Sequence, residues 1–255
     1  MKIKRILILS IIISLCPLSA LFPQGLEIPQ VSADSSIYER SFYTLQYNEK
    51  FEQPDWVAYE LTQEEVVGLA KRSNRFREDR EILSGSVALS DYKYSGYDRG
   101  HLAPAADMKM SSESMDESFL MSNMSPQVPG FNRGIWAFLE SCVRTWASEN
   151  ESIYVVTGPI LTKENYPVIG KNEVAVPEYY FKVILDYKEP DYKGIGFVLP
   201  NRKGEGRLQD YAVSIDEVEG LTGLNFYPLL PDDLEESIES HYDVSLWRFI
   251  EFTSD

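Results

Sequence analysis

Cysteine and histidine are scarce in this chain of 255 residues, which contains two of each. One cysteine, Cys16, lies in an N-terminal segment that we expect to be removed or lipid-modified, so Cys142 would have no disulfide partner. No CxxC or HExxH pattern occurs and no second histidine lies near His101, which argues against a zinc site of the usual kind. The protein must therefore be stabilised by its apolar core, and 44% hydrophobic residues allow one.

Positive charge is also scarce, because 24 lysines and arginines stand against 40 aspartates and glutamates and the formal net charge is −16. A protein that binds nucleic acid over a broad basic surface has the opposite sign, since phosphate neutralisation supplies most of its affinity. A nucleic-acid function would need a local cationic cleft. One cationic cluster is interleaved with acidic residues, which is equally typical of a solvated surface; its members are Lys71, Arg72, Arg75, Arg77 and Arg80.

The N-terminal segment 1–25 has the features of an export signal. Three cations precede an apolar run over residues 6–15, which is too short to span a bilayer comfortably. Ala20 and Gly25 are small residues that a signal peptidase could leave at the new end, whereas the sequence before Cys16 loosely resembles a lipoprotein box. Both outcomes stay open. We expect an exported protein, secreted or periplasmic, that is held at a membrane only if Cys16 carries a lipid.

The rest of the chain predicts one domain over residues 41–255, preceded by a linker over residues 26–40. The linker segment has no clear hydrophobic period and contains Pro29. Alternating apolar residues predict a hairpin, and β-branched and aromatic runs predict the central strands of a mostly antiparallel sheet. The hairpin strands are expected at 42–47 and 56–61, and the central strands at 153–157, 179–185 and 195–199.

Helices are predicted to flank this sheet. The clearest covers residues 131–148, where apolar side chains recur at i, i+3 and i+4. Ser214 opens a capping box for a second helix, which Gly223 would close, and Pro231 opens a third. Because strands are followed by helices without βαβ alternation, the expected fold is α+β with a central, mostly antiparallel sheet.

The stretch 97–107, Tyr-Asp-Arg-Gly-His-Leu-Ala-Pro-Ala-Ala-Asp, contains the most informative residue of the chain. Histidine can exchange a proton near neutral pH, so His101 is the candidate general base of a hydrolase. The alternative is a histidine that only forms a hydrogen bond within a loop.

Hydrolysis of a phosphodiester at a single metal ion needs a base, a cation on the phosphate and stabilisation of the developing charge. Asn132 can supply a hard oxygen ligand, and Glu140 can hold water molecules around the metal. Arg99 or Arg144 can stabilise the phosphate. On a helix at about 100° per residue, Asn132, Glu140 and Arg144 lie within roughly 120° of one another. Magnesium fits such a sparse set, because it retains most of its water.

Several of these residues have a plain structural alternative. Asn123 precedes a Ser-Pro turn and could be only a turn residue, and Asn132 could be only a helix cap. Glu140 and Arg144 are spaced i, i+4, the spacing of a surface helix pair worth about 0.3 kcal/mol.

Taken together, the motifs resemble the DNA/RNA non-specific endonuclease family, the ββα-metal nucleases. The segment Asp98-Arg99-Gly100-His101 is similar to the family signature, and 121–127 and 132–136 are similar to its continuation. The similarity extends over most of the chain from residue 42 to residue 240. The resemblance implies a ββα-metal active-site motif and cleavage of both DNA and RNA with magnesium, or manganese as a substitute. Members of the family that this chain resembles are often homodimers.

The resemblance also implies roles for single residues. His101 would activate water as general base, Asn132 would bind magnesium directly, and Glu140 would hold water molecules on that metal. Asn123 would orient groups around the base and the phosphate, and Arg99 and Arg144 would contact or stabilise the phosphate. An upstream arginine would bind the substrate, and Arg75 is preferred to Arg72 for this role.

Two other functions stay open. A phosphodiesterase acting on smaller substrates would suit the acidic surface better than a long polyanion does. A non-catalytic DNA-binding module would keep the fold, but binding alone does not require the set His101, Asn132 and Glu140.

Overall fold

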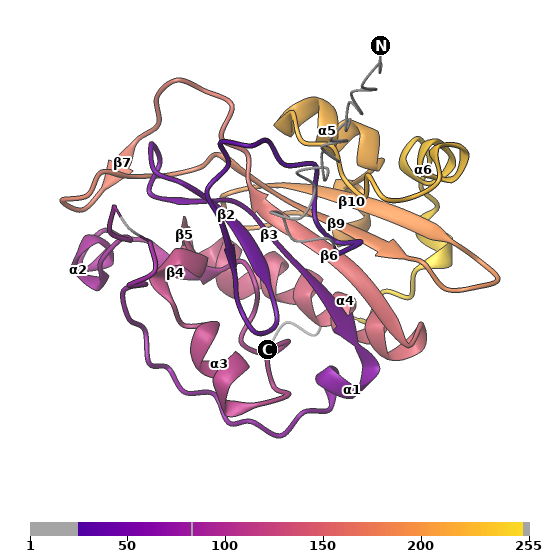
Figure 1. The fold of residues 1–255 in the computed structure, drawn as a ribbon, viewed down its shortest axis with the longest axis horizontal. Helices are drawn as coiled ribbons and strands as arrows, with labels where there is room; N and C mark the ends of the chain where they lie inside the picture. The colour runs from indigo at the N-terminus through magenta and orange to yellow at the C-terminus, as the bar shows by residue number, and fades with distance from the viewer. Residues whose placement is uncertain (1–24, 83, 252–255) are drawn as a thin grey trace, which may run out of the picture.

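A computed structural model describes residues 25–82 and 84–251, and its centre is an antiparallel sheet (Figure 1). Among the described residues, seven strands form this sheet in the order β1-β2-β3-β6-β9-β10-β11, and every neighbouring pair is antiparallel. The prediction of an α+β fold with a central antiparallel sheet is confirmed, as are the hairpin and the three central strands. The strands are β1 (Ile37–Glu39), β2 (Thr44–Asn48), β3 (Gln53–Thr62), β6 (Ser152–Pro159), β9 (Tyr179–Asp186), β10 (Lys193–Pro200) and β11 (Ala212–Val213).

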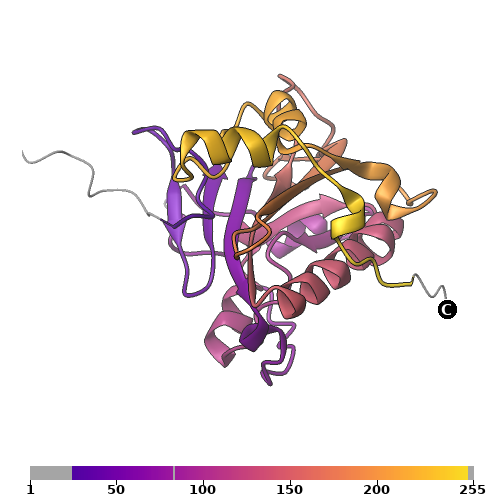
Figure 2. The same ribbon diagram turned by 90° about the vertical axis from the view of Figure 1, so that its right-hand side faces the viewer.

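Helices cover the two faces of the sheet separately. Helix α4 (Ala137–Glu149) packs one face through its buried stripe, which includes Leu139 and Trp146. The other face is covered by α5 (Ile215–Thr222) and α6 (Asp232–Glu239), which pack against side chains of β3, β6 and β9. Figure 2 shows α5 and α6 on one side of the sheet and α4 on the other. Because both faces are covered, the central strands are buried along nearly their whole length.

The caps of α5 are those expected from its sequence. The Ser214 hydroxyl accepts a hydrogen bond from the Glu217 backbone N–H, and the Glu217 carboxylate accepts one from the Ser214 backbone N–H. Gly223 ends the helix at φ 74°, in the left-handed region that glycine adopts without a steric cost. Local chemistry therefore sets both ends of this helix.

The predicted helix over 131–148 is wrong in one respect, because it is not one continuous α-helix. Its first part, η2 (Phe131–Trp136), has π-helical hydrogen bonding, and Gly134 departs from helical geometry at φ −110° and ψ −114°. Regular α-helix begins only at Ala137. The angular relation expected between Asn132 and Glu140 therefore does not apply, because a widened and kinked turn separates them.

The segment 26–40, expected to be a linker, is part of the folded domain. Ile28 is 5% exposed and packs among the side chains that α5 and α6 cover. Strand β1 pairs with β2, and Gln30 N–H donates to Asn225 O at 2.8 Å. A short edge strand that is held by tertiary contacts needs no hydrophobic period of its own. This is why the sequence of residues 26–40 resembled a linker. The expected signal over 1–25 and the lipid on Cys16 lie outside the described residues, apart from Gly25.

The remaining elements are short and lie outside the seven-stranded sheet. They are α1 (Gln63–Val66), α2 (Leu89–Tyr92), β4 (Asp98–His101), α3 (Ser112–Glu117), η1 (Met121–Asn123), β5 (Met124–Gln127), β7 (Val168–Ile169), β8 (Val174–Ala175), η3 (Leu208–Tyr211) and η4 (Val244–Leu246). Strands β4 and β5 form a two-stranded ribbon that leads through η2 into α4, which gives a β-β-α order. In the described part of the chain, Cys142 is buried and free, and no helix is long and apolar enough to cross a membrane.

Candidate active site

The ribbon of β4 and β5 positions the central histidine. Its register pairs Asp98 with Gln127 and His101 with Met124. A Cβ atom at Gly100 would lie 2.1 Å from Oε1 of Gln127, so the ribbon requires glycine between Arg99 and His101. The order Asp-Arg-Gly-His is thus fixed partly by packing beneath the strand.

His101 lies in an aromatic pocket with one nitrogen free. The residue is 8% exposed, and its ring packs edge-on against Phe119 with centroids 4.9 Å apart and lies 5.6 Å from the centroid of Phe76. Its Nε2 has no hydrogen-bond partner among the described residues. Burial lowers the pKa of His101 to about 3, with further lowering from the charges of Arg72 and Arg99. The imidazole is therefore neutral at neutral pH, which is the form that can accept a proton, and its Nε2 is buried without a partner among the described residues.

Two arginines stack on the phenylalanines that enclose this ring. The guanidinium carbon of Arg99 lies 3.9 Å from the centroid of Phe76, and that of Arg72 lies 4.9 Å from the centroid of Phe119. Stacking on a ring leaves the guanidinium N–H groups directed outward in the plane, where they can bind an anion. Together they place two positive charges near His101, the kind of local cationic group that a negatively charged protein needs in order to bind phosphate.

The preference for Arg75 over Arg72 is not supported by the geometry. Arg75 is exposed and forms an ion pair with Asp116 at the edge of α3, including a hydrogen bond from Nε at 3.2 Å. The carboxylate compensates its charge, and Arg75 is not among the charges that shift the pKa of His101. Arg72 instead acts electrostatically on both His101 and Glu140, so Arg72 is the arginine of the upstream segment that lies at the site.

Asn132 is attached to the same ribbon through its side chain. Its Nδ2 donates a hydrogen bond to Oδ2 of Asp98 at 2.9 Å, and Arg133 donates to both oxygens of that carboxylate. The amide oxygen of Asn132 has no protein donor among the described contacts. Asp98 therefore orients the Asn132 amide so that a hard oxygen remains available on its other side. The alternative of a helix cap is wrong, since no side-chain cap is formed at the start of η2.

Glu140 is half-buried and interacts electrostatically with the buried Lys182, and it does not form the expected surface ion pair with Arg144. Arg144 donates to Asp107 at 2.9 Å instead of pairing with Glu140. Beneath Glu140, Lys182 is fully buried, its Nζ lies 4.9 Å from the ring centroid of Trp136, and it has no hydrogen-bond partner among the described residues. Burial raises the pKa of Glu140, while the charge of Lys182 opposes that rise. Burial lowers the pKa of Lys182, against the charge of Glu140.

Arg144 is held in place by a buried acid. Asp107 is 2% exposed and also accepts a hydrogen bond from the Tyr59 hydroxyl at 2.9 Å. A second hydrogen bond runs from Arg144 to Ser141 at 2.9 Å. Much of the charge of Arg144 is therefore compensated by Asp107.

Asn123 does not face the site directly. It is fully buried, its Oδ1 accepts from the Ala103 N–H at 2.9 Å, and its Nδ2 donates to the carbonyls of Ala103 and Ser118. Its backbone carbonyl accepts from the Leu102 N–H at 3.1 Å. The amide has no capacity left for a phosphate, so Asn123 positions the backbone that follows His101 and contacts no substrate.

The family model described as DNA/RNA non-specific endonuclease matches residues 24–233 of this chain. The chain belongs to the DNA/RNA non-specific endonuclease family. The start of the match agrees with the structure, in which the segment before residue 41 is part of the fold.

Individual relatives agree with this assignment. A mitochondrial nuclease of Saccharomyces cerevisiae is 38% identical over 215 residues, which cover 75% of this chain and 65% of that protein. A mitochondrial nuclease EXOG of Danio rerio is 36% identical, with 80% and 63% covered, and a nuclease of Nostoc sp. is 34% identical, with 87% and 84% covered. The chain thus spans slightly less than two thirds of the first two relatives.

A solved structure described as the EndoG/EndoGI complex, with the mechanism of EndoG inhibition as its subject, also matches. One chain of it has a TM-score of 0.72 and 33% identity, with 76% of this chain and 86% of that chain covered. The fold of this non-specific endonuclease family member is therefore shared with a nuclease of known structure.

Sequence reasoning missed the supporting residues of the site. Lys182 had a readable signal, because a lysine in the middle of the apolar run 179–185 must be either exposed or buried with a partner. Asp98 belonged to the signature but had no role assigned, and neither Phe76 nor Phe119 was singled out. Only the fold brings these two rings into contact with each other and with His101.

Proposed function

We propose that this family member is an exported, magnesium-dependent endonuclease that hydrolyses phosphodiester bonds in both DNA and RNA. Membership of the family and the relatives named as nucleases support the reaction class. The observation that carries the proposal is the unpartnered Nε2 of buried His101 beside two stacked arginines. A neutral base next to an anion-binding cleft is what attack by water on a phosphate requires.

In this proposal His101 is the general base. Its neutral imidazole accepts a proton from the attacking water, and the negative phosphate favours the imidazolium that forms. Phe76 and Phe119 fix the plane of the ring and exclude bulk water from it. Asn123 acts only through the backbone, by holding the residues that follow His101.

The donor set fits magnesium, with manganese as a substitute. Asn132 would hold the ion through its amide oxygen, and Glu140 would hold water molecules of the ion's shell. When bound, the ion would polarise the scissile phosphate and offset its developing negative charge. Hard oxygen donors and a small number of protein ligands are the preference of magnesium. Asp98 keeps the Asn132 amide in the orientation that leaves its oxygen available.

Arg99 and Arg72 would hold the phosphate against the base. Their guanidiniums are supported by rings instead of carboxylates, so their charge is available to a substrate. Arg144 would contribute long-range charge from the Glu140 side. All these groups would contact phosphate, and none would contact a base edge. The same site therefore suits DNA and RNA, and sequence preference should be weak.

We also propose export through the segment 1–25, with Cys16 as the point of lipid attachment if the chain is anchored, and a homodimer as the assembly. Export is tested by fractionating cells that express the full chain and measuring the mass of the mature N-terminus. A Cys16→Ser variant that loses membrane association would establish the lipid, and sedimentation would establish the assembly.

A panel of substrates tests the function. Plasmid DNA, RNA and a small chromogenic phosphodiester are incubated with the protein, with and without magnesium, beside His101→Ala. The proposal expects magnesium-dependent degradation of both nucleic acids by the wild type. Cleavage of the small diester alone would instead support a phosphodiesterase that acts on smaller substrates, the alternative function that the net charge of −16 favours. Binding of DNA without cleavage under all conditions would replace it by a binding module.

A further inference from the structure

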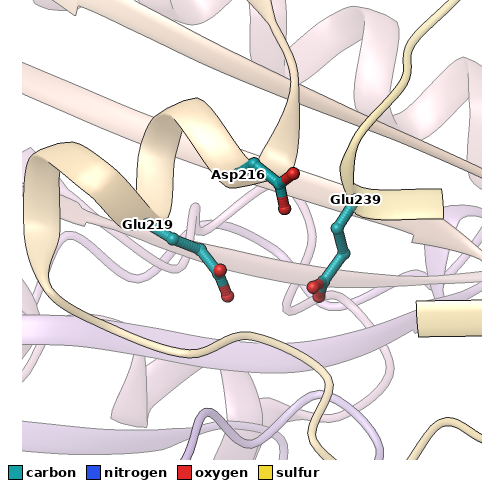
Figure 3. Close-up of side chains that lie close together, drawn as sticks. All are labelled: Asp216, Glu219 and Glu239. Atoms are coloured by element: carbon teal, nitrogen blue, oxygen red, sulfur yellow. The ribbon is translucent and has the colours of Figure 1, made fainter. Parts of the chain in front are cut away.

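Three carboxylates meet on the side of the sheet opposite the candidate active site. Asp216 and Glu219 are one turn apart on α5, and Glu239 is the last residue of α6. One carboxylate oxygen from each residue lies within 4.8 Å of the others. Figure 3 shows the three side chains directed toward a common space. Helices α5 and α6 cover the face of the sheet that α4 does not, so this cluster is separate from Asn132 and Glu140.

Glu239 is the unusual member, because it is buried without a partner. It is 5% exposed, and its Oε1 has no hydrogen-bond partner among the described residues. Burial of an ionised carboxylate is unfavourable because its hydration is lost, unless a cation or a hydrogen-bond donor contacts it. Burial raises the pKa of Glu239 to about 9, and Glu219, Glu235 and Asp216 raise it further.

The surroundings of Glu239 provide no compensating positive charge. The residues whose charges act on it are acidic, and within the described part of the chain none of the ion pairs includes Asp216, Glu219 or Glu239. One oxygen of Glu219 accepts from the Phe226 N–H at 2.7 Å, which fixes that side chain and leaves its second oxygen available. The cluster is therefore a preformed set of hard oxygen atoms that includes a buried, unpartnered carboxylate.

We propose that Asp216, Glu219 and Glu239 bind a calcium ion that links α5 to the end of α6. Carboxylate oxygens without histidine or cysteine select a hard cation over zinc or copper. Calcium accepts irregular sets of six to eight oxygens, whereas magnesium requires a near-ideal octahedron and gives up its water reluctantly. Asp216 is exposed, so water reaches the remaining coordination positions. Sites with so few protein ligands have dissociation constants of about 0.1–1 mM, as in extracellular modules.

The ion would act on stability and not on the chemistry of phosphate cleavage. Ile215, Val218 and Ile238, from the two linked helices, belong to the core on that face of the sheet. A cation between the helices would oppose their separation and the exposure of this core. The inference does not depend on the proposed nuclease activity.

Calcium binding to the full chain is measured by isothermal titration calorimetry, and melting temperature is followed as calcium is added. Glu239→Gln keeps the shape of the side chain and removes its charge, while Glu236→Gln makes the same change at an exposed position of α6. Asn132→Ala removes the proposed catalytic metal ligand. At ten times the dissociation constant, the melting temperature should rise by about 4 °C in the wild type, Glu236→Gln and Asn132→Ala. Glu239→Gln should lose this rise and keep its magnesium-dependent activity.

Two results would overturn the site. One is a wild-type melting temperature that does not change up to about 10 mM calcium, well above the expected dissociation constant. The other is an equal rise in Glu239→Gln. Asp216→Asn changes an exposed member of the cluster, so it gives the same answer if Glu239→Gln fails to fold: retention of the full calcium effect in that variant would also overturn the site.

Discussion

The side-chain amide of Asn132 donates a hydrogen bond of 2.9 Å to the carboxylate of Asp98. This bond joins the strand that carries His101 to the turn that precedes α4. It also fixes which end of the Asn132 amide faces the protein and which end is available to a metal ion. Residues around a metal ligand that orient it in this way are commonly worth a factor of 10 to 100 in metal affinity.

Asp98→Ala should therefore raise the magnesium concentration needed for half-maximal activity by about tenfold or more. The matched control is Arg133→Ala, which removes the exposed ion pair to Asp98 but leaves the Asn132 hydrogen bond. That control should stay within about threefold of the wild type, since exposed ion pairs contribute little. Magnesium titrations of initial rates measure both. Equal magnesium requirements in the two variants would show that the hydrogen bond does not orient the ligand.

Arg72→Ala should lower kcat/KM on plasmid DNA by about 10- to 100-fold, the value of a charged hydrogen bond to phosphate. Arg75→Ala, three residues along, should change it by less than about threefold because Asp116 already neutralises Arg75. Steady-state rates at fixed salt compare the two. A larger loss of kcat/KM in Arg75→Ala than in Arg72→Ala would show that Arg75 is the substrate-binding arginine, as the sequence alone favoured.

Lys182→Met should shift the acidic limb of the pH–rate profile to higher pH. The charge of Lys182 lowers the pKa of Glu140, so its removal raises that pKa further. Glu140 then becomes protonated, and stops holding the water shell, at a higher pH than in the wild type. Rates between pH 5 and 9 measure the limb, and Lys182→Arg should restore part of it. A profile that falls uniformly at every pH would mean that Lys182 only supports packing.

Glu239 should make the protein less stable as pH rises. Its pKa is about 9 in the folded chain against an ordinary value of 4.5, so the folded state binds more protons than the unfolded state between these pH values. The free energy of unfolding must then fall as pH rises through this window. Urea unfolding at pH 5 and pH 8 with EDTA should show a smaller fall in Glu239→Gln than in Glu236→Gln. Equal slopes would mean that Glu239 is not held protonated.

Much of the fold followed from local patterns. The alternation in β2 and β3, the apolar runs of β6, β9 and β10, and the cap at Ser214 are each specified by a few neighbouring residues. The strand at 37–39 and the kink at Gly134 were missed, because an edge strand is specified by its partner and a widened turn by its packing. Neither leaves a period in the sequence.

The candidate site was recovered only in part. His101, Arg99, Asn132 and Glu140 came from a recognisable motif. The choice between Arg72 and Arg75 depended on which arginine meets Asp116 and which meets Phe119, and both contacts join residues more than 40 positions apart. Asn123 was expected to orient groups around the base and the phosphate, and the motif does not reveal that Ala103 and Ser118 use its whole amide. Such outcomes are decided by tertiary contacts.

The most direct test of the account is chemical rescue of His101. Replacement by glycine leaves a space of the size of the missing ring beside Phe76 and Phe119, which pack against it. His101→Gly, with an unchanged melting profile, should cleave plasmid DNA at least about 100-fold more slowly than the wild type, the usual contribution of a general base. Added imidazole should raise the cleavage rate of His101→Gly by at least about tenfold, and sodium chloride of equal ionic strength should not raise it. A folded His101→Gly protein that cleaves DNA at the wild-type rate would contradict the account.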